Sequence, residues 1–213
     1  MRYFGAFLAG LMGLAAMAGT ELAVAGQPQR NILPIATTAT PILDEVKPPV
    51  GWIDFCRSGH DADCRDGDKS PTAIAITAAT WSDIVRVNRY VNNTIEQVED
   101  ITLYGRQEFW TYPDAGKGDC EDIALLKRRI LIREGFPRQS LLMTVVRDET
   151  GAGHAVITIV TDRGDFVLDS KTSQILPWSA TGYGFIKRQS QVNPNVWVKL
   201  GEPASPGLTV AGH

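Results

Sequence analysis

The sequence predicts an α+β fold in which helices precede an antiparallel sheet. Two observations carry this prediction: apolar residues recur at helical spacing in the first half of the chain, and alternating, β-branched segments follow in the second half. The chain has 213 residues, 44% hydrophobic and 21% charged, which is enough to bury a substantial core. A net charge of -3 without any basic run gives no indication of nucleic-acid binding.

The N-terminus has the composition of a secretory signal peptide. Met1-Arg2 gives a positive start, residues 4–18 are apolar or small, and Ala23-Val24-Ala25 is an A-x-A cleavage site. We therefore expect residues 1–25 to be removed and the mature chain, without a membrane span, to be exported to a bacterial periplasm. An uncleaved membrane anchor is the alternative, but the apolar run is short and Glu21 closes it.

Three further segments are expected after the signal peptide. A flexible arm rich in Pro and Thr covers residues 26–50, one domain covers residues 51–202, and residues 203–213 form a C-terminal tail. The domain begins with a short loop between Cys56 and Cys64, which would close as a disulfide in an oxidising compartment. The third cysteine of the chain is then left unpaired.

A long helix is expected early in the domain. It begins near Thr80 or Ser82, either of which could cap it, and ends near Gly105. Its apolar residues are spaced three and four apart and form one stripe of Ile84, Val87, Val91, Ile95 and Val98.

The second half of the domain predicts strands at residues 141–146, 154–160, 166–169 and 197–200. His154 opens the second of these strands and Asp169 closes the third. A turn at Thr161-Asp162 would place the two residues directly opposite each other. A turn at Arg163-Gly164 would instead pair Asp169 with Thr158. Both registers put His154 and Asp169 on one face of the sheet and leave the apolar residues between them on the other, core-facing side.

The unpaired cysteine carries most of the functional information. Cys120 lies in Gly118-Asp119-Cys120-Glu121-Asp122, where a second helix is expected to begin at Asp119 or Cys120. The free N–H groups and the dipole of a first helical turn favour a thiolate. With His154 as base and Asp169 as orienting carboxylate, Cys120 would complete a nucleophilic triad.

The acidic residues around Cys120 oppose this activation. Three neighbouring carboxylates should raise the pKa of the thiol. A His154 imidazolium would offset part of that effect, and a bound cation would offset more. The acids therefore indicate a hard metal such as Ca²⁺, which takes oxygen ligands. The alternative is that they only cap the helix.

Each of the three residues also has a plain structural interpretation. A lone cysteine is most often a small buried hydrophobe, a histidine at a strand start is usually polar surface, and Asp169 can cap a turn. Export, an unpaired thiol, and a histidine and an aspartate on one face occur together in this chain. Taken together, they make the catalytic interpretation as well supported as the structural one.

Several motifs occur together in a pattern typical of one family. They are residues 118–124 with the helix that follows, residues 87–92, residues 104–110, and Gly153-His154-Ala155-Val156 with Val167-Leu168-Asp169. The combination resembles the bacterial transglutaminase-like cysteine peptidases, which include the calcium-dependent periplasmic LapG-type proteases. The resemblance covers about residues 50–200.

The resemblance implies a papain/transglutaminase-like fold, with the nucleophile helix packed on an antiparallel sheet. It implies that Cys120 is the nucleophile, that His154 is general base and then acid, and that Asp169 orients His154, with no cofactor required for the chemistry. Asp119 and Glu121 fall where LapG-type members bind calcium. It also implies a protein substrate in the cell envelope or on the surface, and a regulatory protein of the inner membrane as a partner.

The first functional hypothesis is therefore an exported cysteine peptidase that forms an acyl-enzyme on Cys120. Transglutaminase-type acyl transfer to an amine shares this intermediate and stays open. An alternative of another class is a non-catalytic periplasmic protein-binding module that docks a partner in an aromatic cleft near Trp110.

Overall fold

The structure, a computed structural model, describes residues 33–59, 64–65 and 70–202. The predicted signal peptide at residues 1–25, the first part of the predicted arm and the predicted tail at residues 203–213 lie outside these ranges. Within them, none of the helices combines the length and the hydropathy that crossing a membrane requires.

Helices dominate the first half of the described chain and strands the second. The helices are α1 (Val50–Arg57), α3 (Ala78–Thr94), α4 (Asp100–Tyr104) and α5 (Cys120–Arg133), with 3-10 turns at η1 (Arg138–Ser140) and η2 (Trp178–Ala180). The strands are β1 (Ile42–Val46), β2 (Glu96–Gln97), β3 (Lys117–Gly118), β4 (Leu141–Arg147), β5 (Gly153–Thr161), β6 (Gly164–Leu168), β7 (Leu176–Pro177), β8 (Gly184–Gln189) and β9 (Trp197–Leu200). This is the α+β arrangement that the sequence predicts.

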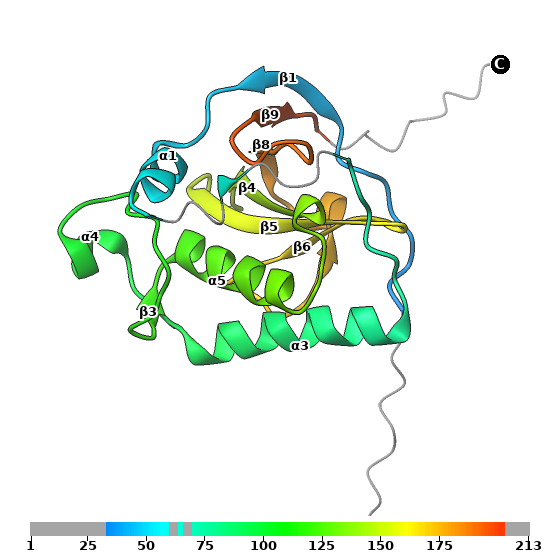
Figure 1. Cartoon of the computed structure of the whole chain (residues 1–213), viewed down its shortest axis with the longest axis horizontal. Coiled ribbons are helices and arrows are strands. Elements are labelled where there is room, and N and C mark those ends of the chain that lie inside the picture. The colour runs from blue at the N-terminus through cyan, green and yellow to red at the C-terminus, as the bar shows by residue number, and fades with distance from the viewer. Residues whose placement is uncertain (1–32, 60–63, 66–69, 203–213) are drawn as a thin grey trace, which may run out of the picture. The chain divides into compact units, whose positions relative to one another are not determined.

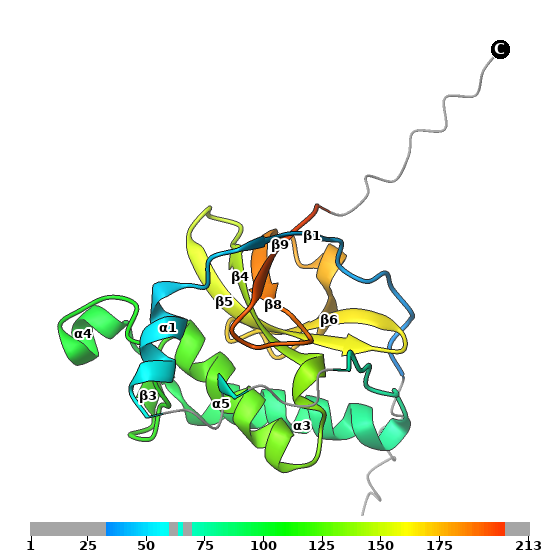
Figure 2. The same ribbon diagram turned by 45° about the horizontal axis from the view of Figure 1, so that its top comes forward.

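Seven strands form one antiparallel sheet in the order β1-β9-β8-β4-β5-β6-β7 (Figure 1). The first and last strands along the chain, β1 and β9, lie side by side at one edge (Figure 2). The predicted arm of residues 26–50 thus contains an edge strand, because Glu45 and Val46 pair with Val198 and Trp197. A separate two-stranded parallel ladder joins β2 to β3.

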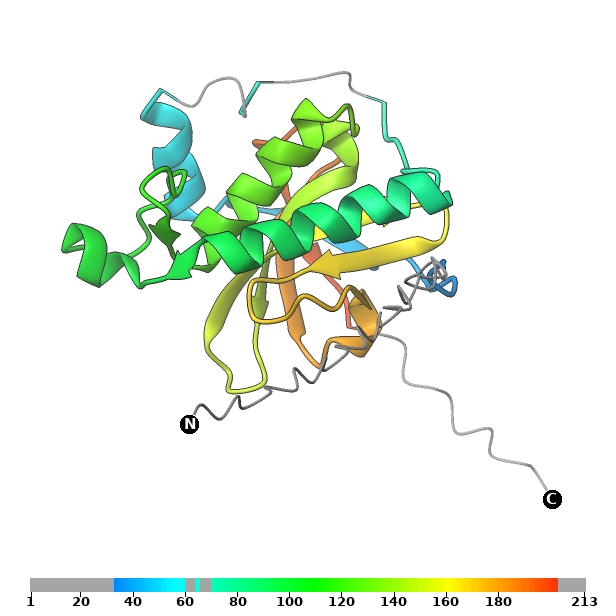
Figure 3. The same ribbon diagram turned by 90° about the horizontal axis from the view of Figure 1, so that it is seen from below.

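Helix α5 packs against β4 and β5, and α3 packs against α5 on the same face of the sheet, where its Trp81 ring meets Phe166 of β6 edge-on (Figures 1 and 3). Thr77, rather than Thr80 or Ser82, caps α3: its hydroxyl accepts from the Thr80 N–H, and the Thr80 hydroxyl accepts from the Thr77 N–H. The predicted helix to Gly105 stops at Thr94, because the following residues turn into β2 and then α4.

Both faces of the sheet are buried. The helix-facing core includes Ile157, Ile159, Phe166 and Leu168, as the strand pattern predicts. The opposite face is buried as well: its Val156 and Val167 belong to a second, smaller cluster with Val146, Trp178, Phe185, Val198 and Leu200. The sequence predicts this second core poorly, because Trp178 and Phe185 come from short segments outside the predicted strands. His154 therefore lies at the margin of an apolar layer and is itself buried.

Helix α1 leads into the predicted disulfide loop. Cys56, near its end, forms a disulfide with Cys64. The Asn195 amide ties this segment to the β8–β9 connection: it donates to the Cys64 carbonyl oxygen at 2.8 Å, and its Oδ1 accepts from Trp52 Nε1 at 3.3 Å. Trp52 is fully buried against Trp110 and Trp197, so α1 is part of the main core.

We expect Gly51→Ala to destabilise the fold by about 1–3 kcal/mol, because an added methyl group would overpack this junction. A Cβ atom at Gly51 would lie 2.2 Å from Trp110 Cδ1, and the Trp110 ring is held in the core. Gly184→Ala is the matched control, since its Cβ would meet only Arg147 Cβ at 3.8 Å. Urea unfolding measures both variants, and equal midpoints would contradict the predicted difference.

Candidate active site

Cys120 is the first residue of α5 and a free thiol. Asp119 occupies the N-cap position, but its side chain forms no capping hydrogen bond, contrary to the capping role that the sequence suggests. The thiol donates to Glu121 Oε2 at 3.0 Å, and the Sγ atom accepts from the Ala155 N–H at 3.4 Å. The start of α5 therefore lies directly beside the first residues of β5.

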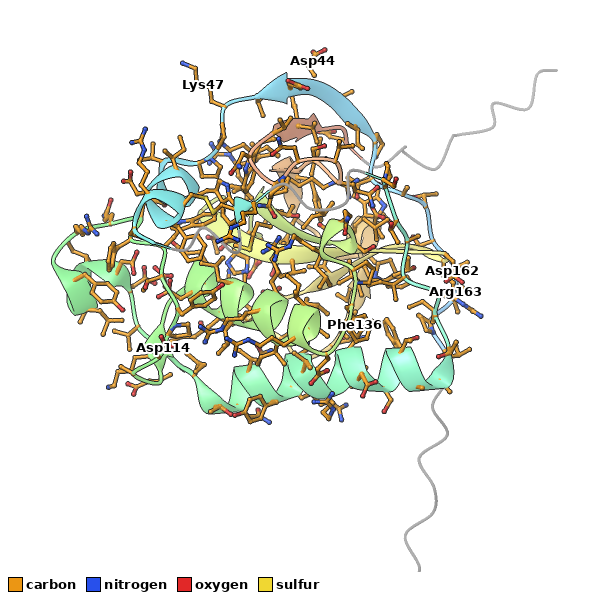
Figure 4. All side chains as sticks on the ribbon, viewed as in Figure 1. Asp44, Lys47, Asp114, Phe136, Asp162 and Arg163 are labelled. Carbon is orange, nitrogen blue, oxygen red and sulfur yellow. A yellow bond between two sulfur atoms is a disulfide. The ribbon has the colours of Figure 1, made fainter. Side chains whose placement is uncertain are left out.

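His154 and Asp169 come together at the ends of β5 and β6. Ile157 pairs with Leu168, a register centred between Asp162 and Arg163 at the turn (Figure 4). This register lies midway between the two predicted ones and makes the contact diagonal rather than direct. The predicted shared face holds, since His154 Nε2 lies 2.8 Å from Asp169 Oδ1 and both side chains are buried.

Side chains from two helices bind the backbone at Asp169. Lys127 Nζ, on α5, and Asn92 Nδ2, on α3, donate to the Asp169 carbonyl oxygen at 2.7 and 2.9 Å. Lys127 has no exposed surface, and burial lowers the pKa of its amine to about 7. Burial opposes ionisation of the Asp169 carboxyl, but hydrogen bonds from His154 and Tyr183 hold its pKa below the ordinary value.

An acidic cluster lies on the other side of Cys120. Carboxylate oxygens of Asp100, Asp119 and Glu121 all lie within 4.8 Å of one another, and the three residues are buried. Asp100 Oδ1 and Asp119 Oδ1 have no hydrogen-bond partner, although the other Asp100 oxygen accepts from the Phe109 N–H. Burial and the neighbouring acids raise the pKa of Asp119 to about 8, and burial raises that of Glu121 to about 7.

The donor set fits a hard cation. Ca²⁺ takes six to eight oxygen ligands, and oxygens that share one ion lie within about 5 Å of one another, as the oxygens of this cluster do. Two buried oxygens without partners are costly unless a proton or a cation satisfies them. Asp119 and Glu121 are the two predicted ligands, and the fold adds Asp100 from α4.

Burial and the Glu121 carboxylate raise the pKa of the Cys120 thiol well above its ordinary value. Burial is the largest cause of this shift, and the neighbouring acids Glu121 and Asp119 add to it, in the direction that the sequence indicates.

Two pockets adjoin at Cys120 and His154. One has a volume of about 550 Å³, and the acidic cluster and Lys171 are part of its lining. The other, of about 310 Å³, has an apolar wall that includes Val50, Trp110 and Val145. A peptide could thus extend past the thiol in both directions, and Trp110 lines the cleft as predicted.

The sequence model of the bacterial transglutaminase-like cysteine proteinases (BTLCP) matches residues 42–205. That match spans most of the chain, including Cys120, His154 and Asp169. The chain belongs to the BTLCP family. It is therefore a cysteine peptidase with the transglutaminase-like fold: α5, which begins with the free cysteine, packs on an antiparallel sheet.

Solved structures of LapG from Legionella pneumophila are similar to this BTLCP chain. A calcium-bound LapG is 24% identical, with a TM-score of 0.49 over 59% of this chain and 73% of that one. A second LapG structure is 25% identical, with a TM-score of 0.48 over 55% and 67%. An EGTA-treated LapG is 24% identical, with a TM-score of 0.48 over 60% and 74%. The comparison with curated proteins found no match.

Three residues at the BTLCP site were not predicted from sequence. Asp100 joins the acidic cluster from α4, Tyr183 contacts Asp169 from the segment before β8, and Lys127 binds the Asp169 backbone. Asp100 and Tyr183 are separated from the motifs by loops, and Lys127 is typical of a solvated helix face in sequence. Only the folded chain brings them to the site.

Proposed function

We propose that the chain is an exported peptidase that hydrolyses a peptide bond of an envelope protein through an acyl-enzyme on Cys120. The observation that carries this proposal is the His154–Asp169 pair, which lies with the free Cys120 thiol where two pockets adjoin. A periplasmic location and an inner-membrane regulatory partner complete the proposal, on the strength of the N-terminal sequence and the family resemblance.

In this mechanism the ionised Asp169 accepts a hydrogen bond from His154 Nε2–H. The second ring nitrogen, Nδ1, is left to take the thiol proton as the sulfur attacks the substrate carbonyl carbon. The imidazolium then gives that proton to the leaving amine, which departs as the C–N bond breaks. Water, deprotonated by His154, hydrolyses the thioester and restores the thiol.

The acidic cluster supports a calcium requirement as part of the proposal. Asp100, Asp119 and Glu121 would hold the ion, which would supply positive charge beside the thiol. The Glu121 carboxylate raises the pKa of the Cys120 thiol, both by its charge and by accepting a hydrogen bond from the S–H group. Neutralising the charge of Glu121 would therefore lower that pKa. The thiol would then be available to His154.

The test is proteolysis of an envelope protein fraction by the purified mature chain in millimolar Ca²⁺. We expect one or a few discrete cleavage products, and we expect Cys120→Ala to produce none, because the acyl-enzyme cannot form. Sequencing the new N-termini would define a peptide substrate. An amine adduct in place of a free carboxylate would indicate acyl transfer, and tight partner binding without cleavage would indicate a binding module.

A further inference from the structure

The Asp169 carboxylate is held at both of its oxygens. His154 Nε2 and the Lys171 backbone N–H contact Oδ1, at 2.8 and 3.0 Å. The Tyr183 hydroxyl contacts Oδ2 at 2.6 Å. An ionised carboxylate only accepts hydrogen bonds, so the hydroxyl is the donor, and this contact is a short, charge-assisted one.

Tyr183 also contacts the histidine directly. Its ring stands edge-on to the His154 ring, with centroids 5.7 Å apart and an interplanar angle of 83°. The Tyr183 backbone N–H donates to the Thr181 hydroxyl at 3.2 Å, which fixes the segment between η2 and β8. Tyr183 therefore approaches Asp169 and His154 from an element that carries neither of them.

Tyr183 lies outside the two pockets that contain Cys120. It lines a separate pocket of about 80 Å³, together with Asp169 and Thr172. A substrate bound at the thiol would not reach the Tyr183 hydroxyl from either of those pockets. Any influence of Tyr183 on the chemistry must therefore pass through Asp169 and His154.

We propose that Tyr183 is a positioning residue of the active site, which fixes the carboxylate plane of Asp169 and the ring of His154. The terminal torsion of an aspartate is broad, so a carboxylate held at one oxygen can rotate. The Tyr183 hydroxyl on the second oxygen removes that freedom, and the edge of its ring limits rotation of the imidazole. This inference rests on the proposed function, because it assigns Tyr183 to the same histidine and aspartate.

The test compares the rate of Cys120 alkylation by iodoacetamide in single and double variants. We expect Tyr183→Phe, which keeps the ring and removes the hydroxyl, to slow alkylation about tenfold near neutral pH while the chain still folds. Tyr90→Phe is the matched control, because Tyr90 is 57% exposed on α3, and its rate should equal that of the unmodified chain. In an Asp169→Asn background, Tyr183→Phe should cause no further slowing.

Multiplicative slowing in the double variant would overturn the proposal, because Tyr183 would then act independently of Asp169. A parallel His154→Ala variant separates this failure from that of the proposed function. If His154→Ala slows alkylation and Tyr183→Phe does not, only the Tyr183 inference fails. If His154→Ala has no effect, both fail.

A second measurement covers the case in which Tyr183→Phe lowers the melting temperature. In the unmodified chain, the hydroxyl proton of Tyr183 should exchange slowly with water and show a nuclear Overhauser contact to the His154 ring, since both groups border the buried Asp169. Fast exchange without that contact would overturn the proposal.

Discussion

We expect Asp169→Asn to lower kcat/KM for peptide hydrolysis by about 10³- to 10⁴-fold while the chain still folds. An asparagine amide can donate to His154 Nε2, which would place the ring proton on Nδ1. That tautomer cannot accept the proton of Cys120, so the base is lost although the geometry is kept.

The fall should appear in kcat rather than in KM, because Asp169 lines neither pocket that contains Cys120. The measurement is steady-state kinetics on the peptide that spans the mapped cleavage site. Asp83→Asn, a half-buried position on α3 that lines neither of these pockets, is the matched control and should retain full activity. A decrease below about tenfold for Asp169→Asn would contradict its role as the orienting carboxylate.

Calcium is expected to stabilise the fold far more at about pH 8 than at about pH 5. Asp119 and Asp122 have a pKa of about 8 in the fold and Glu121 one of about 7, against ordinary values of 3.8, 3.8 and 4.5. A raised carboxyl pKa stabilises the fold fully below the ordinary value, and this contribution is lost as pH rises through the folded value. Metal-free stability should therefore fall between about pH 4 and pH 8.

Ca²⁺ competes with protons for the carboxylates of Asp119 and Glu121, so its stabilising effect grows over that range. Thermal unfolding with millimolar Ca²⁺ or with excess EGTA measures it. Asp119→Asn should remove most of the calcium-dependent shift, whereas Asp44→Asn, on the exposed β1 strand (Figure 4), should leave it intact. A calcium shift that is equal at both pH values, or that survives in Asp119→Asn, would contradict the site.

The same cluster links calcium to thiol chemistry. Chelation should slow Cys120 alkylation by at least about tenfold at neutral pH, because Glu121 then keeps the thiol protonated. Unchanged peptidase activity in excess EGTA would count against the calcium requirement.

The elements with strong periodicity could be predicted from the sequence. The strands β4 to β6 and the termini of β9 follow directly from the residue pattern, and so does a start of α5 at Asp119 or Cys120. The shared face of His154 and Asp169 was also predictable, because a shift of register by two residues keeps every side chain on its face. The exact register was not, since it depends on turn geometry.

The elements that the sequence missed are those in which tertiary contacts override the local pattern. In β8, Arg188 and Gln189 suggest polar surface, yet both are buried. Arg188 Nη1 binds Asp165 Oδ2 at 2.7 Å, and Gln189 Oε1 accepts from the Met143 N–H at 3.0 Å. Strand β1 likewise owes its structure to β9, which lies far away in the sequence.

The pH profile of Cys120 alkylation tests the central claim most directly, namely that the His154 imidazole activates the Cys120 thiol. The other two cysteines are joined in a disulfide, so the label reports on Cys120 alone. With Ca²⁺ present, we predict rapid alkylation near neutral pH in the unmodified chain and a loss of at least about tenfold in His154→Ala. An alkylation rate that depends on pH as for an ordinary thiol, and that is the same in the unmodified chain and in His154→Ala, would contradict the claim.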